Sequence, residues 1–265
     1  MERFLGYSFL NWLIETGDLG TGKGLWCPLH ICLIVALAIW IALCFIVFSR
    51  YKQFALKVTK VVCILMVIFR LGRMALLIIS GKESFIQAMP WHLCHIMALV
   101  FPLYFLTGTK KGFLPIVCVT LFGGILTFLF GDYYKYSVLS FLQLESLFLH
   151  FCMPTVVAGV LASGWFKIDT KDVWQIPILL IMLLCWAELG NTLVPGSNYL
   201  YLRESGLPFN LFGNAHFYFT YLVLVLIMTI VFFAPIVISK IVKREKNKHF
   251  RKLVRQNLVK SWKTW

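Results

Sequence analysis

Residues 26–48 read WCPLHICLIVALAIWIALCFIVF and contain no Asp, Glu, Lys or Arg. An α-helix needs about 20 mostly apolar residues to cross a hydrocarbon core of ~30 Å, so this stretch predicts a membrane-spanning helix. The whole chain of 265 residues has the same character, because 60% of it is hydrophobic and only 14% is charged. Water-soluble domains have about 45–50% apolar and about 25% charged residues, so the composition excludes that class.

Further apolar stretches of similar length follow the first. They predict an all-α fold, a polytopic membrane helix bundle with about seven transmembrane helices. The predicted spans are 26–48, 58–80, 91–107, 113–130, 138–162, 173–190 and 217–239. The third and fourth spans are short, but an unbroken helix through both would bury Lys110 and Lys111 at a large cost. The membrane domain therefore covers 26–239, and an outer interfacial segment, 1–25, precedes it.

The basic residues of the connections alternate from one side of the membrane to the other. Basic residues cluster before span 2, after span 3, after span 5 and after span 7. The other four polar segments carry Arg3 and Lys23, Lys82, Lys135, and Arg203, each with at least one acid. Lysine and arginine mark the cytoplasmic side, so we expect an outside N-terminus and a cytoplasmic C-terminus, N-out/C-in. The net charge of +14 therefore indicates topology, and we expect no nucleic-acid partner.

Two flanking segments have a distinct composition. Residues 240–265 hold ten of the 25 basic residues, interleaved with apolar residues at helical spacing. This pattern predicts a basic amphipathic cytoplasmic tail that lies on an anionic inner leaflet, with a solvated tail as the alternative. The outer loop 191–216 is long and rich in Gly, Pro and Asn, which is typical of a loop that closes over a site.

Ionisable residues inside spans are costly and therefore mark candidate sites. Those of this chain lie mainly in the predicted outer half of the membrane, which favours one outward-facing polar site. The candidate substrate-binding residues are Arg70, Arg73, Trp91, His92, His95, Glu145 and Asn191. Arg70 and Arg73 share a helix face and could hold a phosphate headgroup by bidentate contacts. Alternatively, the two arginines could pair with Glu145 and Glu188.

Cys94 and His150 are the candidate catalytic residues. A thiolate is a strong nucleophile, and a neighbouring histidine can activate it. The adjacent residues Cys94 and His95 point about 100° apart on a helix, so His150 from another span is freer to reach the thiol. The pair would suit acyl transfer through a thioester. The structural alternatives are a packing cysteine and a histidine that joins two helices by a hydrogen bond.

A metal site is a second possible chemistry. His92 and His95 share a helix face at a separation of three residues, and Glu145 or His150 could complete a zinc site with an open position. No span carries a stronger pattern such as HExxH, so we expect neither a metal nor a cofactor.

Two segments resemble a known family. The segment Trp91-His92-Leu93-Cys94-His95 resembles the HLC segment of the YwaF-like integral membrane proteins of bacteria. Residues 191–202, NTLVPGSNYLYL, are similar to that family's loop of Asn, Gly and Asn-Tyr before a final span. The order of spans agrees as well, so the resemblance covers residues 20–240.

The resemblance implies a function. The YwaF-like family is related to a eukaryotic seven-span acyltransferase that moves fatty acyl chains between phospholipids, with a cysteine in the third span and a histidine in the fifth. Those positions resemble Cys94 and His150. Because His95 directly follows Cys94, either histidine could be the base. The loop motif adds Asn198 and Tyr199 to the candidate substrate-binding residues.

We therefore expect an acyltransferase (transacylase) of the bacterial cytoplasmic membrane with its active site facing outside. It would move an acyl chain from a phospholipid through a Cys94 thioester to a lysolipid, lipid or lipoprotein acceptor. The bacterial source is expected because Lys exceeds Arg by 17 to 8. A solute-binding transporter subunit and a metal-dependent membrane hydrolase are the alternatives.

Overall fold

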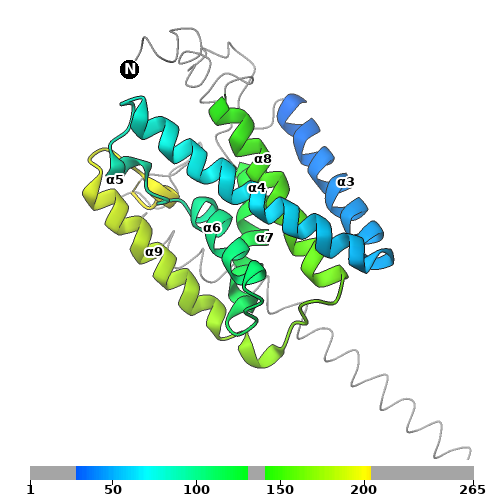
Figure 1. Ribbon diagram of the computed structural model, residues 1–265. Helices are drawn as coiled ribbons and strands as arrows, with labels where there is room; N and C mark the ends of the chain where they lie inside the picture. The colour runs from blue at the N-terminus through cyan, green and yellow to red at the C-terminus, as the bar shows by residue number, and fades with distance from the viewer. Residues whose placement is uncertain (1–27, 131–140, 204–265) are drawn as a thin grey trace, which may run out of the picture. The chain divides into compact units, whose positions relative to one another are not determined.

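The computed structural model describes residues 28–130 and 141–203, and within them the chain is helical and has no strand (Figure 1). Its α-helices are α3 (Pro28–Arg50), α4 (Lys52–Ile79), α5 (Phe85–Ala88), α6 (Leu93–Leu106), α7 (Phe113–Phe130), α8 (Phe141–Ala162) and α9 (Gln175–Leu193). Two 3-10 turns, η1 (Thr170–Asp172) and η2 (Tyr199–Tyr201), complete the described elements. The all-α prediction is confirmed for this part of the chain.

Four of these helices, α3, α4, α8 and α9, are long and apolar enough to cross a membrane, and α6 and α7 are shorter apolar helices. The protein is therefore a multi-pass membrane protein. These six helices match the first six predicted spans in order and place. The predicted segments 1–25, 217–239 and 240–265, and the loop beyond residue 203, lie outside the described residues.

The largest difference from the predicted bounds is the start of α4, which begins at Lys52 rather than at residue 58. Lys52, Lys57 and Lys60 fall in these first helical turns and are exposed. Long lysine stems can lie along apolar surface while the ammonium groups stay in water. The prediction started the span after these lysines because they are charged, whereas the helix itself begins at Lys52.

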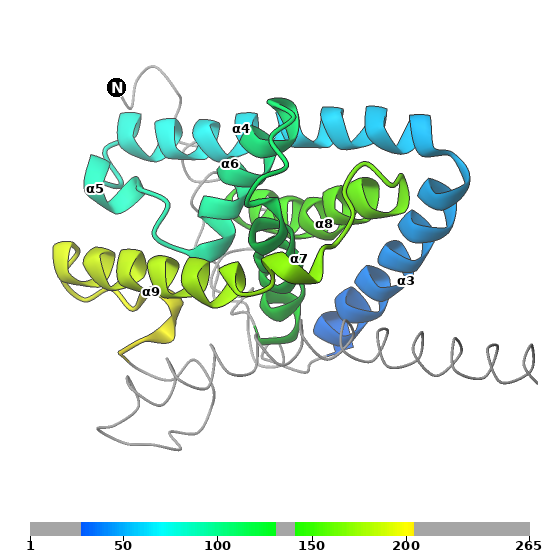
Figure 2. The ribbon, with the colours of Figure 1, turned by 90° about the horizontal axis from the view of Figure 1, so that it is seen from below.

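The helices pack around α8, which contacts α3, α4 and α7. Helix α6 packs between α4 and α7, and α9 packs on α7. Figures 1 and 2 show α9 and α3 on opposite sides of this central group. Three helices from separate parts of the sequence, α4, α6 and α8, thereby meet one another.

Two adjacent glycines of α7 allow close approach on both of its sides. A Cβ atom on Gly123 would lie 2.6 Å from Cδ2 of Leu93 at the start of α6. A Cβ atom on Gly124 would lie 3.1 Å from Cβ of Met153 and 3.5 Å from the backbone oxygen of His150 in α8. These contacts bring the first turn of α6 and the middle of α8 to the same level of α7.

Candidate functional site

The start of α6 is fixed by the short helix that precedes it. Ser84 and Gln87 form a reciprocal capping box at α5, with Gln87 N donating to Ser84 Oγ at 3.3 Å and Ser84 N donating to Gln87 Oε1 at 2.8 Å. The chain then turns tightly, with Trp91 N donating to Met89 O at 2.8 Å, and reaches His92, whose ψ is 146° and which is the N-cap of α6. The indole of Trp91 donates back to Ile86 O at 2.7 Å. Leu93 is consequently the first residue of α6.

Trp91 anchors this entry to α9. A Cβ atom on Gly190 would lie 2.5 Å from the Trp91 ring, so only glycine allows the ring to pack there. Trp91 and Trp186 have ring centroids 4.8 Å apart, and the Trp186 indole donates to Pro90 O at 3.1 Å. Cys94 and His95 therefore lie in the first turn of a helix whose start is held by several contacts.

Charged and nucleophilic side chains from three helices gather next to this entry, and we call them the polar cluster. The polar cluster consists of Arg70 and Arg73 from α4, Cys94 and His95 from α6, and Glu145 and His150 from α8. The two arginines and Glu145 act electrostatically on Cys94. Arg70 and His150 act in the same way on His95. The structure thus brings together six of the residues singled out from the sequence.

One of the two arginines has a fixed partner. Arg73 Nη1 lies 2.8 Å from Glu145 Oε2 and 3.4 Å from Leu142 O. The Glu145 side chain is only 1% exposed, so the ion pair is almost fully withdrawn from water. Removing one partner of such a pair leaves an uncompensated buried charge, which makes the pair a structural requirement.

Arg70 differs from Arg73 although the two lie three residues apart on one helix. It is 3% exposed, and its Nε and Nη1 atoms have no hydrogen-bond partner within the described parts of the chain. The same holds there for Glu145 Oε1 and His95 Nδ1. Buried polar groups in folded proteins are nearly always hydrogen-bonded, so this concentration of unsatisfied atoms indicates a site.

Cys94 occupies the second position of α6. The backbone N–H of His95 donates to its sulfur, and the thiol is free and partly exposed. The first N–H groups of a helix lack intrahelical acceptors and carry partial positive charge. These N–H groups favour a thiolate and the oxyanion that forms when a thiolate attacks a carbonyl, whereas burial of the thiol opposes the charged form.

His150 presents a defined tautomer. Its Nδ1 lies 2.6 Å from Ser146 O, one turn earlier in α8. A carbonyl oxygen can only accept, so Nδ1 carries the hydrogen and Nε2 is the basic nitrogen. His150 therefore has the tautomer that a general base needs.

His92 and His95 lie with their ring centroids 5.2 Å apart, in an edge-to-face arrangement. His92 also packs edge-to-face on Tyr199, at 5.0 Å. Within the described residues, no three His, Cys, Asp or Glu side chains gather closely enough to hold a metal ion. The zinc site considered from His92, His95 and Glu145 or His150 is therefore not formed there.

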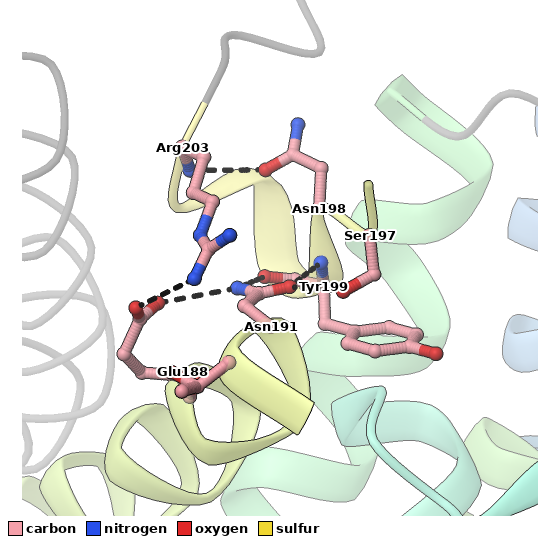
Figure 3. Close-up of polar contacts among 7 residues, drawn as sticks. Glu188, Asn191, Ser197, Asn198, Tyr199 and Arg203 are labelled. Carbon is pink, nitrogen blue, oxygen red and sulfur yellow. Dashed lines mark hydrogen bonds and ion pairs between the residues drawn. The ribbon is translucent and has the colours of Figure 1, made fainter. Parts of the chain in front are cut away.

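The loop after α9 is organised by Asn191, which is 1% exposed (Figure 3). Its Oδ1 accepts from Tyr199 N at 2.6 Å and from Ser197 Oγ at 3.2 Å. Its Nδ2 donates to Tyr199 O at 3.2 Å and to Glu188 Oε2 at 3.3 Å. Every polar atom of the Asn191 side chain is thus engaged in holding Tyr199.

Arg203 closes the same loop from its far end. Its backbone N donates to Asn198 Oδ1 at 2.9 Å, and its Nη2 lies 3.3 Å from Glu188 Oε1. We call Glu188, Asn191, Ser197, Asn198, Tyr199 and Arg203 the α9 loop network. Within the described residues Glu188 therefore pairs with Arg203 and not with an arginine of α4. A substrate-binding role for Asn191 and Asn198 stays a prediction.

The α9 loop network places Tyr199 over the entry to α6. The ring of Tyr199 lies 6.1 Å from that of Trp91. Burial raises the pKa of the Tyr199 phenol above its usual value of 10.0, and the carboxylate of Glu83 adds to the effect. Tyr199 is the link between the α9 loop network and His92 of the α6 entry.

Glu83 is a residue that the sequence analysis missed. It lies in the connection between α4 and α5 and acts electrostatically on both Arg70 and Tyr199. Its position just beyond an arginine-bearing span was the available signal, because such an acid lies at the same end of the bundle as the arginines.

A model of the TMEM164 family matches residues 24–234, and the chain belongs to this family. No curated protein matches the chain, and no solved structure does. The matched region contains the polar cluster and the α9 loop network, so both are features of the family domain of this chain.

Proposed function

We propose that this member of the TMEM164 family is a YwaF-like membrane acyltransferase in which Cys94 is the nucleophile. The observation that carries the proposal is the position of Cys94. It lies at the N-terminus of α6, with the His95 N–H on its sulfur and Arg70 in electrostatic range. These two features favour the thiolate, whereas burial opposes it, so the proposed reaction needs a base beside Cys94.

The proposed topology has seven spans, an outside N-terminus and a cytoplasmic C-terminus. Three observations indicate that the residues of the polar cluster lie at the same depth in the membrane. Arg70 and Arg73 lie in the second half of α4, Cys94 lies in the first turn of α6, and Glu145 lies near the start of α8. Helices that alternate in direction bring these positions to the same end. With an outside N-terminus, that end faces the outer leaflet of a bacterial cytoplasmic membrane.

In the first half-reaction, His150 takes the proton of the Cys94 thiol on Nε2. The sulfur attacks an ester carbonyl of a phospholipid, and the negative oxygen of the tetrahedral intermediate faces the first N–H groups of α6. The carbon–oxygen bond to glycerol then breaks. The leaving alkoxide takes the proton from His150, which yields a lysophospholipid and an acyl-Cys94 thioester.

In the second half-reaction, an acceptor hydroxyl or amine gives its proton to His150 and attacks the thioester carbonyl. The carbon–sulfur bond breaks, the thiolate regains the proton, and the acylated acceptor leaves. A lysolipid, another outer-leaflet lipid and the N-terminal amine of a lipoprotein are the proposed acceptors. His95 is the alternative base, because it directly follows Cys94.

Solute binding is the second candidate function. Three aromatic rings, Trp91, Trp186 and Tyr199, pack beside the histidines of the α6 entry, and Arg70 is a cation without an ion pair in the described residues. Aromatic side chains with a few convergent polar groups are typical of small-molecule sites. A transporter subunit would use the same residues without a reactive thiol.

The test is the intact mass of the purified protein after incubation with phospholipid vesicles and no added acceptor. We expect a hydroxylamine-labile mass increase of one acyl chain, absent from Cys94→Ala. The matched control is Cys185→Ala, which removes an exposed thiol from α9 and should leave the adduct unchanged.

His150→Gln and His95→Gln assign the base. We expect the rate of adduct formation to fall about 10²–10⁴-fold for the residue that is the general base. An adduct that persists in Cys94→Ala would refute the proposed nucleophile. If no adduct forms in any variant and a water-soluble molecule copurifies, solute binding replaces acyl transfer.

A further inference from the structure

Arg70 is a buried cation whose charge is not balanced by a close carboxylate. Two acids of the described chain act on it, Glu145 and, more weakly, Glu83. Glu145 already holds Arg73 at 2.8 Å, and no ion pair joins Arg70 to either acid. Glu83 is partly exposed and lies in the connection to α5. The guanidinium of Arg70 is therefore more than 4.0 Å from every carboxylate of the described residues.

A guanidinium in this position is costly for a folded protein. A buried charge without a partner forfeits its hydration, and each unmade hydrogen bond adds to the penalty. Replacing an unpaired buried charge with an apolar side chain of similar volume should therefore stabilise the protein rather than weaken it. An arginine that opposes stability in this way fits a residue that awaits a ligand.

The geometry points to a phosphate subsite at Arg70, which we propose binds the phosphate of an amphiphile while Arg73 holds Glu145 in place. Planar guanidinium groups suit phosphate oxygens, and Nε and Nη1 offer two donors that no described residue uses. The inference deepens the proposed function, because it assigns the headgroup of the acyl donor to one named residue.

The ligand reaches Arg70 from the side of α6. The Nε and Nη1 atoms of Arg70 are closed to solvent, so the side chain must rotate when a ligand arrives. On the α6 side, His92, Cys94 and His95 are all partly exposed. A phosphate at Arg70 would therefore lie close to Cys94, as a phospholipid requires if its ester is to meet the thiol.

The first experiment measures thermal unfolding of the full chain in a neutral detergent without lipid. Arg70→Met should unfold at the same temperature as the parent or at a higher one. Arg73→Met should unfold at a lower temperature, because Glu145 loses its partner. An Arg70→Met protein as unstable as Arg73→Met would overturn the proposal, since Arg70 would then already have a counter-ion in the protein.

The second experiment measures binding of three soluble probes: dihexanoyl phosphatidylglycerol, dihexanoylglycerol and inorganic phosphate. All variants also carry Cys94→Ala, so no acyl transfer can occur and failure of the proposed chemistry leaves the test intact. We expect Arg70→Met to weaken binding of the phosphate-bearing probe at least about tenfold. The matched control is Arg50→Met, which removes an exposed arginine from the last turn of α3 and should keep the affinity.

The probes also identify the source of the phosphate. Tight binding of the phospholipid with weak binding of phosphate assigns the subsite to a lipid headgroup, and equal binding of both assigns it to free phosphate. The proposal is overturned if dihexanoylglycerol binds as tightly as dihexanoyl phosphatidylglycerol. It is also overturned if Arg70→Met binds every probe as the parent does.

Discussion

The polar cluster and the α9 loop network lie at the same end of the helices, yet they satisfy their polar atoms in opposite ways. In the α9 loop network, each side-chain atom of Asn191 that can form a hydrogen bond does so within the protein. In the polar cluster, buried atoms of Arg70, His95 and Glu145 have no such partner among the described residues.

This difference separates two uses of polarity inside a membrane protein. A satisfied network fixes the backbone, and its removal costs the hydrogen bonds that it makes. Unsatisfied buried atoms lower stability, and they are retained where a substrate or another ligand supplies the missing partner. Substitutions in the two regions should therefore differ in the sign of their effect on stability.

The largest expected effect is that of Arg73→Met, which tests whether the ion pair between Arg73 and Glu145 stabilises the fold. The substitution leaves Glu145 buried and uncompensated, and such a loss costs about 3–5 kcal/mol. The measurement is the thermal unfolding midpoint in detergent. The double variant with Glu145→Leu should recover most of the loss. If the single variant is as stable as the parent, Glu145 does not depend on Arg73.

An intermediate effect is expected for Asn191→Ala in the α9 loop network. The change removes four hydrogen bonds and leaves the backbone of Tyr199 without its partners, which should cost about 2–4 kcal/mol. Limited proteolysis between residues 194 and 203 and the unfolding midpoint both report this loss. Arg203→Gln breaks only a partly exposed ion pair and should cost less than about 1 kcal/mol.

The smallest expected effect concerns Tyr199 and pH. Its pKa is raised above 10.0, first by burial and then by Glu83. The unfolded chain therefore loses this proton at a lower pH than the folded chain. The contribution of Tyr199 to stability is complete below pH 10.0 and declines as the pH rises toward the folded pKa. Unfolding midpoints between pH 8.5 and 11, in ~0.5-unit steps, should fall less steeply for Tyr199→Phe than for the parent. If the unfolding midpoint falls equally steeply with pH in both proteins, the pKa of Tyr199 is not raised by folding.

The course of the helices could be read from the sequence because long uncharged runs have few alternatives in a membrane. The predicted spans 113–130 and 91–107 agree with α7 and α6 to within two residues at each end. The capping box of Ser84 and Gln87 at the start of α5 follows the common pattern of a serine followed three residues later by a glutamine. The sequence analysis did not predict this helix. Such short polar signals are easily overlooked between two apolar runs.

The pairing of charges could not be read in the same way. Arg70 and Arg73 are equivalent by helical spacing, and either could have met Glu145. The choice depends on how α4 and α8 are rotated against each other, which is set by packing over their whole length. For the same reason, the sequence could not assign Glu188 to Arg203 rather than to an arginine of α4.

The shortness of α6 has a consequence for the lipids around it. At 14 residues, the helix is roughly 21 Å long, well below the ~30 Å thickness of a hydrocarbon core. A bilayer next to a short apolar segment becomes thinner, which draws headgroups and ester carbonyls toward the segment's ends. Cys94 lies in the first turn at one of those ends. If the proposed function holds, a substrate lipid would therefore meet the thiol by lateral diffusion, without being lifted out of its leaflet.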